Sequence, residues 1–232
     1  MHRPAPDRAG TPLFQLHNHQ LSYADQQGEK VVLADLSLCI HAGEKVALVG
    51  SSGSGKSTLL KLLRQQQPDS AYCPQHLGLV GPLSVFHNLY MGRLQRYGWR
   101  RNLRNLVWPS REQLQATAHL ATELGLDAQL RRSVDRLSGG QQQRTALGRA
   151  LYQQSPIFIG DEPVSSVDEF QADQLLGLIN RAHATVVVAL HDQTLALKHY
   201  ERIIGLRGGR LVLDAPAATL TADELAAVYH AP

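Results

Sequence analysis

Short apolar runs, each ended by glycine, proline or polar turn residues, divide the chain and predict an alternation of strands and helices. Residues 13–49 alternate and turn in the manner of strands. Two later runs are uninterrupted and rich in β-branched residues, which suits strands that are buried on both faces of a parallel sheet. The runs that we assign to strands are 31–33, 36–40, 46–49, 157–159, 185–190 and the hairpin 202–206 and 210–213, with 72–75 as a short strand or an extended entry to a loop.

Helical patterns fill the intervals between these runs. One helix is expected over 56–66, ending before Pro68, and two more are expected over 138–152 and 168–182. Between residues 83 and 137 the pattern is helical throughout. The fold class that follows is α/β, with a mostly parallel core sheet and a helical lobe inserted at about 83–137.

A capping box predicts where one helix of this lobe begins. Ser110 is the expected N-cap, and Gln113 is its reciprocal partner three residues later. Leu114, Ala118 and Ala121 then share one face of the helix, which we expect to be its buried apolar face.

The composition is that of an ordinary soluble globular protein, with 43% hydrophobic and 19% charged residues. A chain of 232 residues fits a single domain, which we expect over 13–232, after a flexible tail at 1–12. The tail lacks the apolar core of a signal peptide, and no run approaches the ~18 to 20 apolar residues of a membrane span. A role at a membrane would therefore need another chain to cross it.

Charge and cysteine content narrow the possible functions further. The net charge of +3 is too small to argue for a nucleic-acid partner. Cys39 and Cys73 show neither a C-x-x-C motif nor zinc-site spacing, so we expect free thiols in a reducing compartment.

A glycine- and serine-rich turn between an apolar run and a leucine-rich helix carries the most specific chemical signal. Small residues let backbone N–H groups point at phosphate oxygens, and the helix that follows directs its positive end at the same anion. Lys56 is expected to reach the β- and γ-phosphates of a nucleoside triphosphate, and Ser57 to bind Mg²⁺. The alternative is a turn that only links a strand to a helix. The residues that fit the pattern G-x-x-x-x-G-K-[ST] are Gly50, Ser51, Ser52, Gly53, Ser54, Gly55, Lys56 and Ser57, followed by Thr58.

Two carboxylates follow the predicted strand over 157–159. Ligands of open α/β sheets bind at the carboxyl ends of the strands, where the glycine-rich turn is also expected. Asp161 is therefore expected to hold Mg²⁺, directly or through water, and Glu162 to act as the general base for an attacking water. The alternative is an exposed Asp-Glu-Pro turn.

A second candidate phosphate cradle opens the helix over 138–152. Ser138 at the N-cap and the two glycines after it offer free N–H groups and a helix dipole to an anion. One γ-phosphate rarely needs two cradles from the same chain, so a head-to-tail pair of chains would use both. The alternative is a capped surface helix. The cradle consists of Ser138, Gly139, Gly140 and Gln141.

Three other features carry weaker signals. His191 directly follows the predicted strand over 185–190, so it is expected at the same edge as the phosphates. Gln75 follows a short strand and could sense Mg²⁺ or the attacking water. The basic and aromatic segment 93–111 could bind nucleic acid, but a partner-facing or solvated surface agrees better with the small net charge.

Taken in their order along the chain, the motifs resemble those of the ATP-binding subunits of ABC transporters, over about residues 13–216. Within that family, the chain is most similar to the ATPase subunits of phosphonate importers. The matching motifs are Walker A at Gly50–Thr58, Walker B at Ile157–Glu162, the LSGGQ signature at Leu137–Gln141, the D-loop with Ser165 and Asp168, the Q-loop glutamine at Gln75, the switch histidine at His191, and Tyr23 as the aromatic that stacks on adenine.

The resemblance implies a P-loop NTPase of the ABC cassette type, which hydrolyses ATP with Mg²⁺. It assigns catalysis to Glu162, His191, Gln75 and Lys56, with Gln75 added to the expected Mg²⁺ ligands. Only residues 59–74 separate Walker A from Gln75, where family members have a longer stretch, so we expect a reduced antiparallel β-lobe.

The partners that the resemblance implies are a second ATPase subunit, as a homodimer, and a transmembrane permease. A periplasmic or extracellular solute-binding protein would take part indirectly, and no nucleic acid is expected. The subunit would lie peripherally on the cytoplasmic face of the cell membrane and energise import of a phosphonate or related phosphorus oxyanion. The alternatives are import of a different small solute, a soluble ABC ATPase acting on nucleic acid or ribosomes, a P-loop kinase, and a shortened cassette that does not hydrolyse ATP.

Overall fold

The computed structural model describes residues 12–25 and 28–229, and over 23–25 and 28–30 it describes the backbone alone. Most of the tail expected at 1–12 therefore lies outside the described residues. Pro12, however, already belongs to the first strand, β1 (Pro12–Asp25). Across the described ranges, none of the helices combines the length and the apolar character that crossing a bilayer requires. Cys39 and Cys73 are free thiols, as expected.

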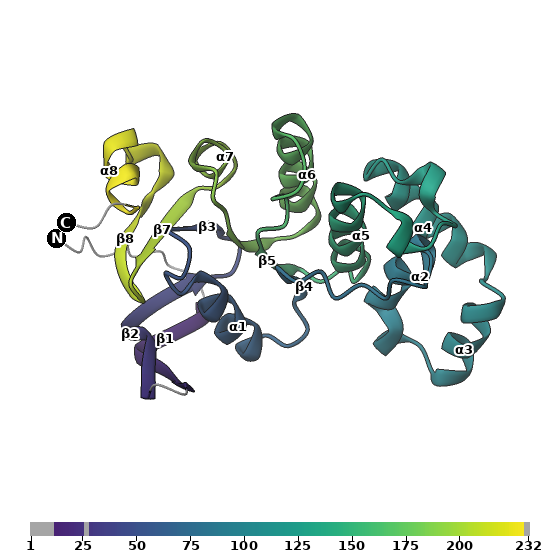
Figure 1. Cartoon of the computed structure of the whole chain (residues 1–232), viewed down its shortest axis with the longest axis horizontal. Helices are drawn as coiled ribbons and strands as arrows, with labels where there is room; N and C mark the ends of the chain where they lie inside the picture. The colour runs from purple at the N-terminus through teal and green to yellow at the C-terminus, as the bar shows by residue number, and fades with distance from the viewer. Residues whose placement is uncertain (1–11, 26–27, 230–232) are drawn as a thin grey trace.

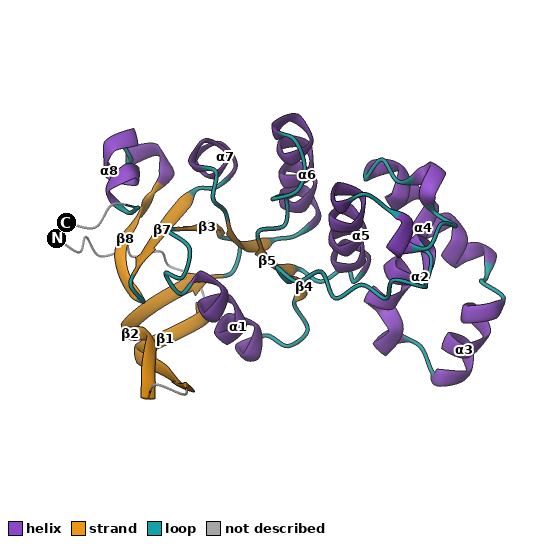
Figure 2. Cartoon of the chain, in the orientation of Figure 1, coloured by secondary structure: helices purple, strands orange, loops and turns teal. Residues whose placement is uncertain are grey.

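A six-stranded sheet forms the centre of the molecule (Figures 1 and 2). Its strands lie in the order β4-β5-β6-β3-β7-β8. Neighbouring strands are parallel from β4 to β7, and only the final hairpin of β7 and β8 is antiparallel. The mostly parallel sheet that the sequence predicts is therefore confirmed. The strands are β3 (Lys45–Val49), β4 (Ala71–Cys73), β5 (Ile157–Asp161), β6 (Thr185–Ala189), β7 (Arg202–Arg207) and β8 (Arg210–Pro216).

A separate antiparallel pair of long strands, β1 and β2 (Gly28–His41), makes up the reduced β-lobe. The two short strands expected at 31–33 and 36–40 are one continuous strand. Asp35, which lies between the two runs, adopts a φ of 49°, a left-handed conformation at a register shift in the pairing with β1, and the strand continues through it. The sequence pattern shows this break in alternation but cannot distinguish a bend from a turn.

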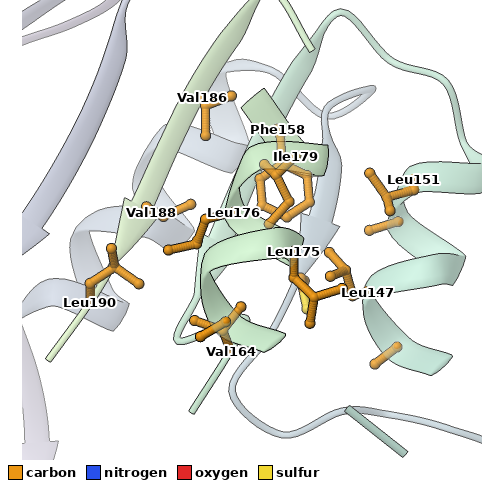
Figure 3. Close-up of a cluster of buried hydrophobic side chains, with 14 of the residues drawn as sticks. Leu147, Leu151, Phe158, Val164, Leu175, Leu176, Ile179, Val186, Val188 and Leu190 are labelled. Carbon is orange, nitrogen blue, oxygen red and sulfur yellow. The ribbon is translucent and has the colours of Figure 1, made fainter. Parts of the chain in front are cut away.

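Alternating side chains of the central strands enter two different hydrophobic clusters, one on each face of the sheet. In β3, Val46 and Leu48 pack with β1, β2 and α1 (Lys56–Gln66), whereas Ala47 and Val49 pack on the other face. That second face is covered by α6 (Glu169–Ala182) and its neighbours, and Figure 3 shows Leu176 of α6 among the side chains of β5 and β6. The nearly unbroken apolar runs reflect this burial on both faces.

The helical lobe extends from one end of the sheet (Figure 1). Its first and last segments lie side by side, because Ser84 forms a bridge with Ser133 and the Val134 amide donates to the Leu83 carbonyl at 3.0 Å. The two ends of the segment between residues 83 and 137 therefore lie together. The remaining helices are α2 (Val85–Tyr90), η1 (Met91–Arg96), α3 (Trp99–Val107), α4 (Arg111–Glu123), η2 (Asp127–Gln129), η3 (Val134–Arg136), α5 (Gly139–Tyr152), α7 (Gln193–His199), η4 (Ala217–Thr219) and α8 (Ala222–Ala227).

The start of α4 is as predicted, but its capping box is incomplete. The Ser110 hydroxyl accepts a hydrogen bond from the Gln113 amide at 3.4 Å. The Gln113 side chain does not return to Ser110; it donates to the Tyr97 hydroxyl at 3.0 Å and accepts from the Tyr152 hydroxyl. The expectation of a reciprocal box is therefore wrong, because two tyrosines occupy the side chain that would close it.

The buried face of α4 is also offset from the predicted one. Gln113, Thr117 and Ala121 are buried, whereas Leu114 and Ala118 are only half-buried. The Thr117 hydroxyl donates to the Gln113 carbonyl at 2.7 Å. A fully hydrogen-bonded polar pair can occupy a core position, and a pattern of apolar residues alone does not reveal it.

Candidate active site

The topology brings the predicted motifs to one edge of the sheet. β5, β6 and β3 are parallel neighbours, so their carboxyl ends lie side by side. From these ends the chain continues into Asp161 and Glu162, into His191, and into Gly50. Gln75 follows the next strand, β4, and is exposed. Motifs that are more than 100 residues apart in sequence thus meet at the position where α/β sheets bind ligands.

Backbone geometry explains two glycines of the turn between β3 and α1. Gly50 has a φ of 145°, and a Cβ there would lie 2.1 Å from the Leu206 carbonyl oxygen. Gly55 has a φ of 103°, and a Cβ would lie 2.7 Å from Leu33. A side chain at Gly50 would clash with the backbone of β7, and one at Gly55 would be strained by the positive φ and crowded by β2. Gly55 is also the N-cap of α1, and no side chain of the described residues caps its N–H groups.

Lys56 lies inside this turn. The side chain is buried, and its Nζ donates to the carbonyl oxygens of Gly50 at 2.6 Å and Ser51 at 3.0 Å. Burial lowers the pKa of Lys56, while the carboxylates of Glu162 and Asp161 act to raise it. A lysine that is held by two backbone carbonyls stands ready to exchange them for the stronger charge of a phosphate.

Asp161 is a buried carboxylate at the end of β5. Burial raises its pKa, a hydrogen bond from the Ser57 side chain lowers it, and the Glu162 carboxylate raises it further. Within the described part of the chain, the Asp161 Oδ1 atom is buried without a hydrogen-bond partner. A buried oxygen without a partner, next to a serine hydroxyl, is a donor set that suits Mg²⁺.

Glu162 forms a short contact with His191. Its Oε1 lies 2.6 Å from Nε2 of His191, which brings together two predicted residues from the ends of β5 and β6. The His191 side chain is half exposed, so the pair faces the solvent at the sheet edge. The Glu162 backbone has a φ of 54°, which is uncommon for a residue other than glycine and marks a constrained position.

The residues of the second predicted cradle cap the start of α5, on the other face of the sheet from α1. Ser138 and Gln141 make a complete capping box at the start of α5. The side chains of α5 belong to the cluster that packs with α6, whereas those of α1 pack against β1 and β2. Gly140 lies against the D-loop, because a Cβ there would come within 2.9 Å of the Ser166 carbonyl oxygen.

The remaining predicted residues have these positions. Asp168 is the N-cap of α6, and its carboxylate accepts a hydrogen bond from the Gln171 amide at 2.9 Å. The Ser165 amide donates to the Glu162 carbonyl at 3.3 Å, so the first residue of the D-loop is hydrogen-bonded to the general-base candidate. Tyr23 lies on β1, but its side chain falls outside the described residues, and its predicted contact with adenine stays a prediction.

Two side chains of α5 were not singled out from the sequence. Gln143 contacts the Glu162 turn, and Arg149 donates to the carbonyl oxygens of Leu77 at 2.6 Å and Gly78 at 2.7 Å, just after Gln75. The helix that begins with the second cradle thus holds two segments of the sheet edge. A detectable signal existed for Gln143, because it is a polar residue on the otherwise apolar stripe that continues through Leu147.

A second surface of different character lies between α2 and α3. Trp99 and Leu103 of α3 are 69% and 58% exposed, and with Leu106 they line an apolar groove on the helical lobe. Arg100, Arg101 and Arg104 lie between these positions in the sequence. Exposed apolar patches of this kind mark surfaces that another molecule covers.

Comparisons with known proteins agree with this geometry. The family model described as "ABC transporter" matches residues 33–71 and 64–165. The phosphate-import ATP-binding protein PhnC of Mycolicibacterium smegmatis is 38% identical over 238 residues, covering 88% of this chain and 88% of that protein. The phosphonates import ATP-binding protein PhnC of Nocardia farcinica is 37% identical over 247 residues, which cover 91% of this chain and 90% of that protein.

Among solved structures, a dimeric ATP-binding cassette in a post-hydrolysis state with ADP and phosphate superimposes with a TM-score of 0.76. It is 26% identical and covers 88% of this chain and 98% of its own. The match therefore includes both the sheet and the helical lobe. This chain belongs to the ABC transporter family.

Proposed function

We propose that this chain is the ATP-hydrolysing subunit that energises an ABC importer. The observation that carries the proposal is the 2.6 Å contact between Glu162 and His191, beside a glycine-rich anion cradle and a buried carboxylate. A site that only binds an anion does not require a fixed carboxylate at its entrance. A carboxylate that a histidine orients is suited to taking a proton from water.

Phosphate binding is assigned to residues 50–58. Backbone N–H groups of the turn and the start of α1 would face the β- and γ-phosphates, and Lys56 would leave the carbonyls of Gly50 and Ser51 for them. Ser57 and Asp161 would hold Mg²⁺, with Gln75 as a further ligand. The ion would neutralise charge that develops on the phosphates during hydrolysis.

Hydrolysis is assigned to the Glu162–His191 pair. Glu162 accepts a proton from the attacking water, and His191 keeps the carboxylate in place and contacts the γ-phosphate. Lys56 stabilises negative charge on the phosphates as the bond to the leaving group breaks. Gln75 senses Mg²⁺ or the water and transmits its presence to the loop that follows, where Arg149 is hydrogen-bonded to the carbonyl oxygens of Leu77 and Gly78.

Two copies of the chain would make two complete sites. The cradle at 138–141 starts on the opposite face of the sheet from α1, so it is suited to close over a nucleotide that a second copy holds. Ser165 and Asp168 flank Ser166 and Val167, which lie against Gly140 of the cradle, and would contact the second copy. The dimeric cassettes among the structural neighbours support this arrangement.

The groove between α2 and α3 is assigned to the permease. Trp99, Leu103 and Leu106 can bury against an apolar segment of a transmembrane partner, and the arginines of α3 can contact its polar ends. The subunit would then lie on the cytoplasmic face of the cell membrane, with a solute-binding protein acting on the far side. A phosphonate or a related phosphorus oxyanion is the proposed cargo, because relatives named as phosphonate and phosphate importers match most of the chain.

Replacing Glu162 by Gln tests the hydrolytic assignment. Glu162→Gln keeps the size and hydrogen-bonding capacity of the side chain but removes the base, so ATP hydrolysis should slow by ~10²-fold or more. ATP binding and ATP-dependent dimerisation should remain, as size-exclusion chromatography with and without ATP would show. Lys56→Ala is the matched contrast, because it should weaken nucleotide binding itself. Parental turnover by Glu162→Gln would refute the assignment.

The cargo needs an experiment in cells. Deletion of the gene should abolish growth on a phosphonate as sole phosphorus source, and the parental gene should restore it where the Glu162→Gln gene does not. Growth of the deletion strain on that phosphonate, with loss of growth on another solute, would reassign the cargo without affecting the ATPase assignment.

A further inference from the structure

The Gln143 side chain connects α5 to the turn that carries Glu162. It is 97% buried, as its exposed fraction of 3% implies. Its Nε2 donates to the Glu162 carbonyl oxygen at 2.8 Å and to the Ser165 hydroxyl at 3.1 Å. Its Oε1 accepts from the Ser166 amide at 2.5 Å. One amide group therefore spans the first and last residues of the turn from the general-base candidate to the D-loop.

This turn needs a fixed support because its backbone is constrained. Glu162 has a φ of 54°, and its amide donates to the Ala189 carbonyl of β6 at 3.2 Å. A residue with a side chain stays in this region only when the surrounding contacts determine it. The β6 contact fixes the amide side of Glu162, and Gln143 fixes its carbonyl side. Together these contacts set the direction in which the carboxylate leaves the backbone.

Gln143 is also rigidly related to the cradle at the start of α5. It lies two residues after Gln141, on a helix whose first turn is closed by the capping box of Ser138 and Gln141. A movement of this helix end would therefore move the Gln143 amide and, through it, the Glu162 carbonyl. In a head-to-tail pair, the cradle faces the partner's nucleotide, whereas Glu162 faces the nucleotide of its own chain.

We infer that Gln143 is a positioning residue for hydrolysis, which sets the Glu162 carboxylate and the D-loop according to the position of α5. The inference rests on the proposed function, because it takes Glu162 as the general base. It adds that closure of the cradle on one nucleotide aligns the base at the other. Gln143 itself does not touch the nucleotide.

Gln143→Met tests this role, because methionine keeps the length of the side chain and removes both hydrogen-bonding atoms. A misplaced base lowers turnover without changing ground-state binding, so kcat should fall at least ~10-fold while KM for ATP stays within about twofold. Gln143→Glu is the second variant. It keeps an acceptor for the Ser166 amide but loses the donor to Glu162, and it should lower kcat in the same way.

Gln142→Met is the matched control on the same helix. The Gln142 side chain donates to the carbonyl oxygens of Val134 at 3.1 Å and Leu137 at 3.3 Å, so the substitution removes two hydrogen bonds of similar geometry that do not reach the Glu162 turn. Its kcat should remain within about twofold of the parental value. Thermal melting of each variant separates turnover from loss of folded protein.

The outcomes distinguish this inference from the proposed function. If Glu162→Gln is inactive while Gln143→Met and Gln143→Glu keep parental kcat, the positioning role is wrong and the general base stands. A fall in kcat that matches only the fraction of unfolded protein, or an equal fall with Gln142→Met, also overturns the positioning role. If Glu162→Gln keeps parental turnover, the proposed function itself is wrong.

Discussion

The carboxyl edge of the sheet and the groove on the helical lobe differ in almost every physical respect. The edge holds a buried carboxylate at Asp161 and a left-handed backbone at Glu162. The groove displays large apolar side chains, with Trp99 mostly exposed. Each arrangement is unfavourable in the isolated chain, since one keeps a charge away from water and the other keeps apolar surface in it.

The difference indicates what each region lacks. A buried carboxylate with an unpartnered oxygen becomes favourable when a cation reaches it. An exposed apolar groove becomes favourable when an apolar partner covers it. The edge is therefore suited to bind a cation, and the groove is suited to bind an apolar partner. Because the two regions are separate, variants that affect one region should leave the other unchanged.

Asp161→Asn should have the largest effect of the variants that separate the two regions. Under the proposed function the substitution removes the charge that would hold Mg²⁺, so Mg²⁺-dependent ATP hydrolysis should fall by about 10- to 100-fold. The apo protein should instead become more stable, because a neutral amide replaces a carboxylate that burial disfavours. Assays of turnover and of thermal melting on the same preparation measure both effects. A variant that loses activity and stability together would contradict this explanation.

The stability gain should depend on pH in a defined direction. Burial raises the pKa of Asp161 in the folded protein above its ordinary 3.8, so the folded state binds more protons than the unfolded state. Parental stability therefore falls as pH rises from 3.8 through the folded pKa. The advantage of Asp161→Asn should be greatest at neutral pH and should disappear as the pH approaches 3.8. Melting temperatures of both proteins across this range would measure it.

The same contrast explains how much the sequence could predict. The edge is made of local motifs with defined residue types and spacing, so the sequence alone could propose residues 50–58, Asp161, Glu162 and His191 and their placement at one edge of the sheet. The short interval between Thr58 and Gln75 led to the expectation of a reduced antiparallel β-lobe, but not to its two long strands. The sequence could not show that Glu162 and His191 are in contact, because strand order decides which strand ends are neighbours.

The detailed contacts of the groove and of the support of the edge depend on tertiary packing. The composition of segment 93–111 indicates a partner-facing or solvated surface, but only the fold shows which apolar side chains of α3 are exposed and line the groove. Gln113 was assigned to a capping box but instead joins two tyrosines. The position of Gln143 on the apolar stripe of α5 distinguishes it from its neighbours in sequence, but only its contacts show that it supports the Glu162 turn. Polar side chains in a core are specified by partners that are distant in sequence.

Polar substitutions in the groove should affect transport and spare hydrolysis. Trp99→Gln combined with Leu103→Gln removes the two most exposed side chains among those that line the groove, and the affinity for permease in detergent should fall about tenfold or more. Basal ATP hydrolysis should stay within about twofold. Val107→Gln is the matched control, since Val107 is also exposed on α3 but does not line the groove. Equal loss of affinity in the control would place the permease elsewhere on the lobe.

A substitution at the start of α4 should have the smallest effect and tests whether the two regions are coupled. Ser110→Ala removes the N-cap acceptor for the Gln113 amide, which should cost about 1 kcal/mol of unfolding free energy. Thr122→Ala on the same helix removes only a hydroxyl that donates to the Ala118 carbonyl, and it should change stability by less than about 0.5 kcal/mol.

Comparison of these two variants separates a local loss in the lobe from coupling to the edge. Denaturant titration gives both stabilities, and ATP affinity measured on the same proteins gives the coupling. If the lobe and the edge are independent, Ser110→Ala should lower stability and leave ATP affinity at the parental value, because Ser110 caps a helix that contributes no residue to the edge. A shift in ATP affinity with Ser110→Ala, but not with Thr122→Ala, would show that the packing of α4 affects the nucleotide site. The effect would then be transmitted by α5, because α5 packs against α4 and its Gln143 side chain is hydrogen-bonded to Glu162.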